Sequence, residues 1–232
     1  MARKKAEAKP VDGVAAPAGP SFTVAIDGPA GAGKGTVARG LAAQYGFAHL
    51  DTGLLYRAVG KLAMDTGRGV IDEGAAELIA RDLRPEHVTI PGLRSALAAR
   101  AASRVAKFPG VRKALIAFQR DFARRPGGAV LDGRDIGTVI CPDAEVKLFL
   151  IASAEARAER RYQELIAAGA ETSRGRVLAE IRARDTQDAE RESAPMRQAP
   201  DAHLIDTTDL DIEAAVATAA ALIDRARAAA RP

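Results

Sequence analysis

A glycine-rich segment near the amino end carries the residues best suited to hold phosphate groups. It reads Asp27-Gly28-Pro29-Ala30-Gly31-Ala32-Gly33-Lys34-Gly35-Thr36 and directly follows a short apolar run. Glycines let the backbone curl so that successive N–H groups point inward, and the start of a following helix adds partial positive charge. Lys34 is expected to reach the β- and γ-phosphates of a nucleotide, and Thr36 to offer its hydroxyl to a Mg²⁺ ion bound to them.

This segment departs by one residue from the pattern G-x-x-x-x-G-K-[ST]. Gly35 occupies the Ser/Thr place, and Thr36 comes one position later. The alternative is a glycine-rich turn between a strand and a helix that binds no ligand. The apolar run before it, the amphipathic segment after it and the placement of Lys34 favour phosphate binding.

Three further motifs place arginines beside aspartates, and each follows a predicted strand or lies in a predicted helix. They are Asp51-Thr52-Gly53 with Tyr56-Arg57 after it, Asp132-Gly133-Arg134-Asp135-Ile136-Gly137-Thr138, and Arg184-Asp185-Thr186-Gln187-Asp188-Ala189-Glu190-Arg191. Guanidinium groups match phosphate oxygens, and transfer between two polyanions requires positive charge to bring them in line. The motifs therefore indicate phosphoryl transfer in addition to nucleotide binding.

The elements that must position these motifs alternate between strand and helix. Five short apolar runs read as buried strands: Thr23 to Ile26, Phe47 to Leu50, Ala129 to Leu131, Val146 to Ile151, and Ala202 to Ile205. Helical segments are expected between the first two runs and over residues 93–124, 155–168, 175–191 and 212–230. This alternation predicts an α/β fold with a parallel five-stranded sheet and helices on both faces.

Length and composition limit the possible classes of protein. The 232 residues suit one domain over 21–232, preceded by a disordered tail over 1–20. Residues 1–20 hold half of the net charge of +4 and aromatic residues make up 4%, so we expect no nucleic-acid partner. Cys141 is the only cysteine and is expected to be a small buried hydrophobe. The sequence shows no signal peptide or membrane span, so we expect no membrane partner and a cytoplasmic location.

The combination of motifs resembles that of the bacterial cytidylate kinases over nearly everything from Val24 to the C-terminal helix. The resemblance implies transfer of the γ-phosphate of ATP, with Mg²⁺, to CMP or dCMP in pyrimidine metabolism, by a monomer. It also implies an acceptor-binding insert at about 60–125 and a lid at about 155–190. We keep a related kinase acting on UMP or AMP, and a non-catalytic nucleotide sensor, as alternatives.

The resemblance implies a role for each residue that matches a family motif. ATP would contact Gly28 to Thr36, with Thr36 toward the metal, and the catalytic residues would be Lys34, Asp132, Arg134 and Arg191. The acceptor phosphate would be held by Arg57, Arg134 and Arg191, the cytosine ring by Ser103, Arg112 and Asp135, and the ribose by Arg184 and Asp188. Thr52 and Tyr56 complete the CMP-binding set.

Several of these residues also have ordinary structural interpretations. Asp132 fits a helix cap or an ion pair as well as a role in placing Mg²⁺. Ser103 and Arg112 fit plain helix surface, and the spacing of Arg184 and Asp188 fits an intrahelical ion pair. Three arginines that open the predicted lid fit either a cover over ATP or a solvated, salt-bridged face; they are Arg157, Arg160 and Arg161. His49, His87 and His203 lack metal-ligand spacing, and we interpret them as structural.

Two features depart from the family pattern. Long-form members carry a β-rich insert before the helix that holds Ser103, whereas here only residues 87–92 stand in its place. Gln187 also stands where an arginine is often found. We therefore expect a truncated insert and the absence of one ribose or lid contact.

Overall fold

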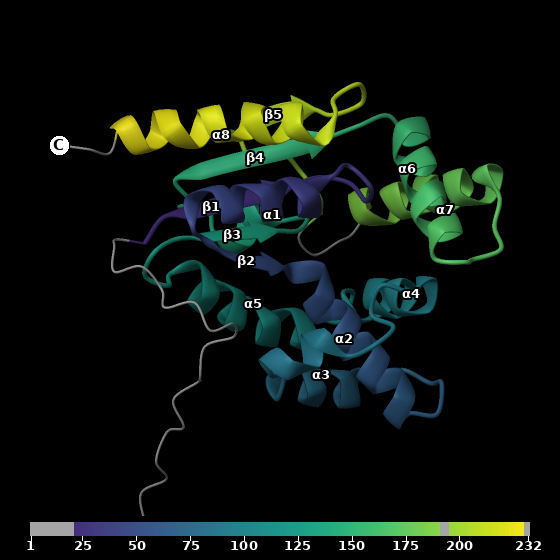
Figure 1. Cartoon of the computed structure of the whole chain (residues 1–232). Coiled ribbons are helices and arrows are strands. Elements are labelled where there is room, and N and C mark those ends of the chain that lie inside the picture. The colour runs from purple at the N-terminus through teal and green to yellow at the C-terminus, as the bar shows by residue number, and fades with distance from the viewer. Residues whose placement is uncertain (1–20, 191–194, 230–232) are drawn as a thin grey trace, which may run out of the picture.

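The computed structural model describes residues 21–190 and 195–229, in which five strands form one parallel sheet. The strands are β1 (Thr23–Asp27), β2 (Ala48–Asp51), β3 (Ala129–Asp132), β4 (Val146–Ile151) and β5 (His203–Asp206). Their order across the sheet is β2-β3-β1-β4-β5, and every neighbouring pair is parallel. The carboxyl ends of all five strands therefore meet at one edge (Figure 1). The fold class predicted from the sequence is confirmed.

The two faces of the sheet are covered by different helices because successive strand residues point to opposite sides. Val24 and Ile26 pack in one cluster with α1 (Lys34–Tyr45) and α8 (Ile212–Ala229). Ala25, between them, belongs to a second cluster on the other face. The central strands β1 and β3 are thus buried on both sides, as expected of a parallel sheet, whereas the edge strand β5 is mostly exposed.

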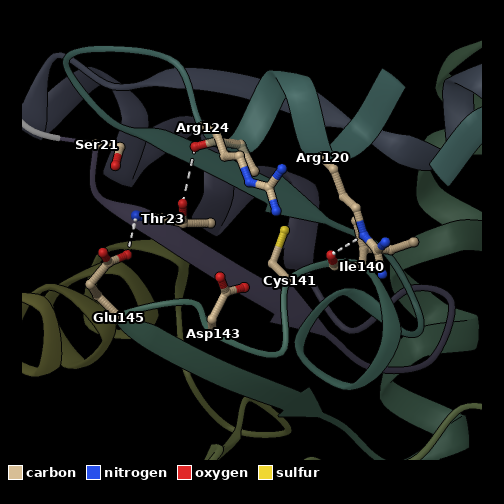
Figure 2. A pocket seen from close by; sticks show the side chains of 9 residues that line it. Ser21, Thr23, Arg120, Arg124, Ile140, Cys141, Asp143 and Glu145 are labelled. Carbon is tan, nitrogen blue, oxygen red and sulfur yellow. Dashed lines mark hydrogen bonds between the residues drawn. The ribbon is translucent and has the colours of Figure 1, made fainter. Parts of the chain in front are cut away.

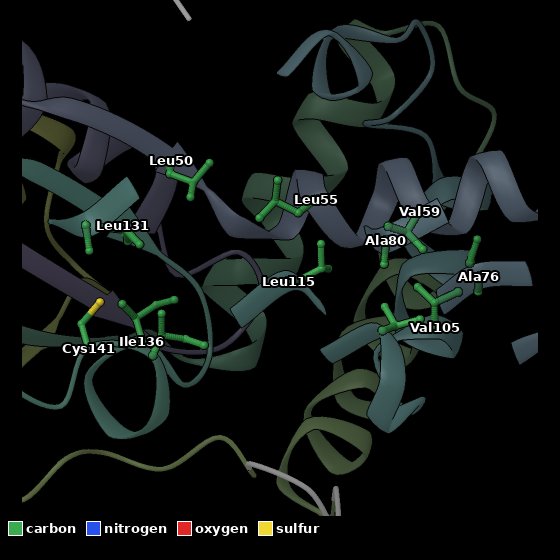
Figure 3. Close-up of a cluster of buried hydrophobic side chains, with 14 of the residues drawn as sticks. Leu50, Leu55, Val59, Ala76, Ala80, Val105, Leu115, Leu131, Ile136 and Cys141 are labelled. Carbon is green, nitrogen blue, oxygen red and sulfur yellow. The ribbon is translucent and has the colours of Figure 1, made fainter. Parts of the chain in front are cut away.

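The second face is covered by helices that lie between β2 and β3 in the sequence. They are α2 (Thr52–Thr66), α3 (Glu73–Arg81), α4 (Ala96–Val105) and α5 (Pro109–Ala123), with a 3₁₀ turn, η1 (Pro85–Thr89), before α4. Of these, α2 and α5 contact β3, whereas α4 packs on α2 and α3 packs on α5. Figure 3 shows their apolar side chains gathering with those of β2 and β3, among them Leu55, Val105 and Leu115. Cys141 is buried in this cluster, as the sequence predicted.

One expectation from the sequence, a continuous helix over 93–124, is wrong. Ser95 caps α4, which ends at Val105, and α5 begins only at Pro109. Proline has no backbone N–H and forces the preceding residue out of the helical region, and Phe108 accordingly has φ −80° and ψ 116°. The break lets α4 pack on α2, where a Cβ added at Gly60 would lie 2.7 Å from the carbonyl carbon of Ala101.

Beyond β4 the chain forms a helical hairpin of α6 (Ala154–Ala167) and α7 (Arg174–Ala189). Figure 1 shows the hairpin at the carboxyl end of the sheet, on the side where β1 runs into α1. Its bounds are close to those expected from the sequence. Within the described ranges, no helix is both long and apolar enough to cross a membrane.

Candidate active site

The segment from Gly28 to Thr36 leads from the end of β1 into α1, as a phosphate-binding loop requires. Gly28, Gly31 and Gly33 have φ values of 140°, 80° and 81°, which residues with a Cβ rarely adopt. At Gly28 a Cβ would also lie 2.0 Å from the carbonyl oxygen of Leu150 on β4. The loop therefore curls tightly against the sheet edge, and glycine is what allows it.

Three carbonyl groups of this loop are held by side chains. The carbonyl oxygen of Pro29 accepts from Lys34 Nζ at 2.7 Å, and that of Ala32 accepts from the Thr207 hydroxyl at 3.2 Å. The carbonyl oxygen of Ala30 accepts from a guanidinium on α6 at 3.1 Å. These bonds fix the shape of the loop, and the two from Thr207 and the α6 guanidinium come from outside it.

Lys34 is a buried lysine, with 6% of its surface exposed. Burial, and then the neighbouring charge of Arg134, lower its pKa to about 7, while Asp132 opposes the shift. A lysine in this state is poised to interact strongly with an incoming anion, because a phosphate group would stabilise its charged form.

Thr36 and Asp132 are the residues of this region that can face a metal ion. The Thr36 hydroxyl, partly exposed, is 3.3 Å from Arg39 Nη2, and Asp132 Oδ1 lies 3.9 Å from where a Cβ of Gly35 would be. Among the described residues, no group of three His, Cys, Asp or Glu could hold a metal without further ligands. This donor set fits an ion that arrives with a polyphosphate and takes oxygen ligands from it.

Asp132 is hydrogen-bonded to a histidine, a contact that is an ion pair, one of the two ordinary interpretations offered by the sequence, only when the imidazole is protonated. Its Oδ2 lies 2.8 Å from His49 Nε2 on the adjacent strand β2. Its carbonyl oxygen accepts from the Thr52 hydroxyl at 2.8 Å. His49 thus orients a carboxylate that lies beside the phosphate loop.

Four arginines from different parts of the chain influence one another near the carboxyl ends of β2 and β3. Burial is the main cause that lowers the pKa of Arg57, on α2, and Asp51 opposes this shift. The positive charges of Arg161, Arg94 and Arg134 lower the pKa as well. Arg57 Nη1 donates to the carbonyl oxygen of Leu93 at 2.8 Å. Positive charges crowded in this way repel one another, and an anion such as a phosphate would relieve the repulsion.

A second, deeper site holds a buried ion pair. Arg112 on α5 and Asp135 after β3 approach to 2.5 Å, and both are buried. Tyr56 is close enough to Arg112 to raise the pKa of its guanidinium group. Ser103, on α4, is partly buried. Arg112 is therefore not plain helix surface.

On α7, Asp188 is 3% exposed and links two predicted site residues. Its Oδ2 accepts from Arg134 Nε at 2.8 Å and lies 4.0 Å from Arg184 Nε. The intrahelical ion pair proposed from the sequence is present, and Asp188 also joins α7 to the loop after β3. Arg191 lies outside the described residues.

Comparison with known proteins decides the family. The family model described as "Cytidylate kinase" matches residues 24–225. Curated cytidylate kinases of Cereibacter sphaeroides and Rhodopseudomonas palustris are 58% and 51% identical over 211 and 208 residues. Each alignment covers 90% of this chain and 98% of the relative. The chain belongs to the cytidylate kinase family.

A solved structure of an uncharacterised protein from Eubacterium ventriosum is also similar. It has a TM-score of 0.53 and 15% identity, over 88% of this chain and 98% of that one. This likeness shows that the fold is shared and nothing further.

Two features of this cytidylate kinase family member were missed by sequence reasoning. Arg157 is buried and binds Asp185 through two bonds of 2.9 and 2.7 Å, so the solvated-face interpretation is wrong for this arginine. It is also the donor to Ala30 described above. Of its neighbours, Arg160 donates to Thr207 and Arg161 pairs with Glu164.

Asp27 is the second missed residue. The sequence showed an acidic residue closing an apolar strand, but no pattern indicated its partners. Both carboxylate oxygens accept backbone N–H groups, from Ile136 and Gly137. Burial raises its pKa to about 6, and these two hydrogen bonds oppose the rise.

A small hollow lies away from this site, beside the amino end of β1 (Figure 2). Thr23, Arg124, Cys141 and Glu145 are among its lining residues. Since the phosphate loop leaves the opposite end of β1, this hollow is separate from the candidate active site.

Proposed function

We propose that this chain transfers the γ-phosphate of ATP to CMP or dCMP, giving ADP and CDP or dCDP. One observation carries the proposal. Three features lie near the carboxyl edge of one sheet. They are a glycine-rich loop with a buried lysine, a cluster of arginines, and a buried arginine–aspartate pair. The loop suits a triphosphate, the arginines suit the phosphate of the acceptor, and the buried pair suits a polar base. Membership of the cytidylate kinase family supports the same reaction.

For the donor, we infer that Gly28 to Thr36 surround the β- and γ-phosphates with backbone N–H groups. Lys34 would exchange its bond to the Pro29 carbonyl oxygen for phosphate oxygens. Thr36 would contribute a hydroxyl ligand to Mg²⁺, with Asp132 positioned by His49 close by. Bound with ATP, Mg²⁺ would neutralise charge on the phosphates.

For the acceptor, we infer that Arg57, Arg134 and Arg191 hold the phosphate of CMP. Thr52 and Tyr56 lie on α2 with Arg57 and would line the same site. Arg184 and Asp188 would bind the ribose from α7. An oxygen of the acceptor phosphate then attacks the γ-phosphorus, and the bond from that phosphorus to the β–γ bridging oxygen breaks. The acceptor is already anionic, so positioning and charge neutralisation do most of the work.

The base would be read by the buried pair and by Ser103. The Asp135 carboxylate can accept from the exocyclic amine of cytosine, and Arg112 can donate to the ring acceptors. Uracil lacks that amine, so a buried carboxylate would face an acceptor in its place. The mutual bond of 2.5 Å holds both side chains in place before the base arrives.

Around these contacts we propose an acceptor-binding part at about 60–125 and a lid at about 155–190. A cytoplasmic location and a monomeric state stay predictions from the sequence. Closure of the lid would exclude water and protect ATP from hydrolysis.

A coupled assay of ADP release tests the proposal, with CMP, dCMP, UMP and AMP as separate acceptors. CMP or dCMP should give the highest kcat/KM. Equal or greater activity with AMP would overturn the assignment of cytosine. ATP binding without transfer to any acceptor would instead support the sensor.

A further inference from the structure

Asp27, the last residue of β1, is a buried carboxylate that the proposed transfer does not use. Only 4% of its surface is exposed. Oδ1 accepts from the N–H of Ile136 at 2.8 Å, and Oδ2 accepts from the N–H of Gly137 at 2.7 Å. These two groups open η2, the π-helical turn over Ile136–Ile140, where N–H groups at the start of a turn need partners from outside it.

The same carboxylate joins two parts of the candidate site. Gly28, which opens the phosphate loop, is its next neighbour in the chain. Arg134 and Asp135 directly precede the two N–H groups that it binds. Ladder pairing of β1 with β3 runs only to the pair Ile26 and Asp132. Past that point, the bond from the Gly133 N–H to the Ile26 carbonyl oxygen and the two bonds to Asp27 hold the segment in place.

Two lysines near Asp27 are engaged elsewhere. Lys34 Nζ donates to the Pro29 carbonyl oxygen, and Lys147 Nζ lies 2.6 Å from Asp201. The charge of Asp27 is therefore balanced mainly by directed N–H groups rather than by a direct ion pair. A buried charge is costly, and two fixed hydrogen bonds from consecutive residues give it a geometric role.

We propose that Asp27 is a positioning residue that holds the Arg134–Asp135 segment in the geometry that binds the acceptor nucleotide. The proposal rests on the proposed function, since it takes CMP as the acceptor. The donor loop should depend on Asp27 much less, because its own carbonyl groups are held by Lys34, Arg157 and Thr207.

The variant Asp27→Asn tests this role, because the asparagine side chain has nearly the same volume as that of aspartate. An asparagine side chain offers one accepting oxygen, and its NH₂ would face the other N–H, which then loses its partner. Leaving a buried N–H unpaired should raise the KM for CMP by about 10-fold or more. The KM for ATP should stay within about 2-fold, and the preference for CMP over UMP should fall.

Thr23→Val is the matched control, since Thr23 is a buried polar residue on the same strand, at its other end. Its hydroxyl donates to the Ala123 carbonyl oxygen at 3.0 Å. This variant should lower the melting temperature and leave both KM values unchanged. The proposal is overturned if Asp27→Asn behaves in the same way, or if it raises the KM for ATP as much as the KM for CMP.

Hydrogen exchange in the wild-type protein gives a measurement that needs no variant. The amides of Ile136 and Gly137 should exchange slowly, and CMP should slow them further whereas ATP should not. If CMP does not change the exchange rates of these two amides, the proposal is overturned, even if Asp27→Asn does not fold. If the wild-type protein phosphorylates no acceptor, the proposed function fails, and calorimetric titration of both proteins with CMP still decides the role of Asp27.

Discussion

Two buried side chains of opposite sign lie beside the end of β1, and both have pKa values displaced toward neutrality. Burial is the main cause in each case, lowering the pKa of Lys34 to about 7 and raising that of Asp27 to about 6. Sequence reasoning identified Lys34, because glycines and a helix start define its surroundings. Asp27 was missed because its partners are backbone N–H groups more than 100 positions away, which no local pattern reveals.

At the residue scale, the lowered pKa of Lys34 predicts proton uptake when ATP binds. Without ligand, a large part of Lys34 is neutral near pH 7.5, and the phosphates of ATP should restore its charge. We expect uptake of about half a proton or more per ATP at this pH. Calorimetric titrations in two buffers of different ionisation enthalpy measure it.

Lys34→Arg is the control for this titration, since arginine stays protonated throughout. The variant should take up clearly fewer protons per bound ATP at the same pH. Equal uptake by both proteins would show that the protons bind elsewhere, for example on ATP itself.

At the element scale, the helical hairpin and the phosphate loop share one arginine. Arg157 on α6 reaches Asp185 on α7 and the Ala30 carbonyl oxygen in the loop. The sequence predicted both helices and left the arginines of α6 as either a cover over ATP or a salt-bridged face, because helical periodicity does not reveal which arginine points inward. The break before Pro109 was likewise missed, because residues on both sides of it favour helix.

Replacing this arginine should therefore weaken ATP binding. Arg157→Lys keeps the charge but cannot bind Asp185 in two places while also reaching Ala30. We expect the KM for ATP to rise by about 5-fold or more, with a smaller change in the KM for CMP. Steady-state kinetics with each substrate varied in turn measures this.

Arg182→Lys is a close control, because Arg182 also joins α7 to α6, through Glu155, but on the surface. Exposed pairs contribute little, so both KM values should stay near those of the wild type. If the two variants were indistinguishable, the link from the hairpin to the loop would have no role in ATP binding.

At the scale of the whole molecule, the sequence predicted the parallel sheet and the family, and both are confirmed. Buried strands and motifs at strand ends are local signals, and parallel pairing brings such ends together. The contacts of Arg134 with Asp188 and of Arg112 with Asp135 join distant elements, and their geometry required the folded chain. The roles of these residues in binding CMP stay predictions.

The stability of the molecule should carry a pH dependence from Asp27. Its pKa is about 6 in the folded protein against an ordinary value of 3.8. Between these values the folded protein binds more protons at this carboxyl than the unfolded chain, so its contribution to stability falls as pH rises. Across this window the free energy of unfolding should decline by about 3 kcal/mol relative to Asp27→Asn.

Urea unfolding of both proteins at intervals from pH 4 to pH 7 measures the difference. Carboxylates whose pKa is lowered, such as Glu159, act in the opposite direction but are common to both proteins. A difference that is constant across this range would contradict the prediction.

Asp27 and Gly28 are adjacent in the chain at the end of β1, yet they contact different parts of the candidate site. One residue bonds to the segment that carries Arg134 and Asp135, and the next opens the phosphate loop against Leu150. In the proposed function, these adjacent residues would link the acceptor site to the donor site through one peptide bond, whose length side-chain substitution does not change. On that proposal, room for a larger acceptor would have to come from α4 and α5, around Ser103 and Arg112, and the proposed position of phosphate transfer would not move.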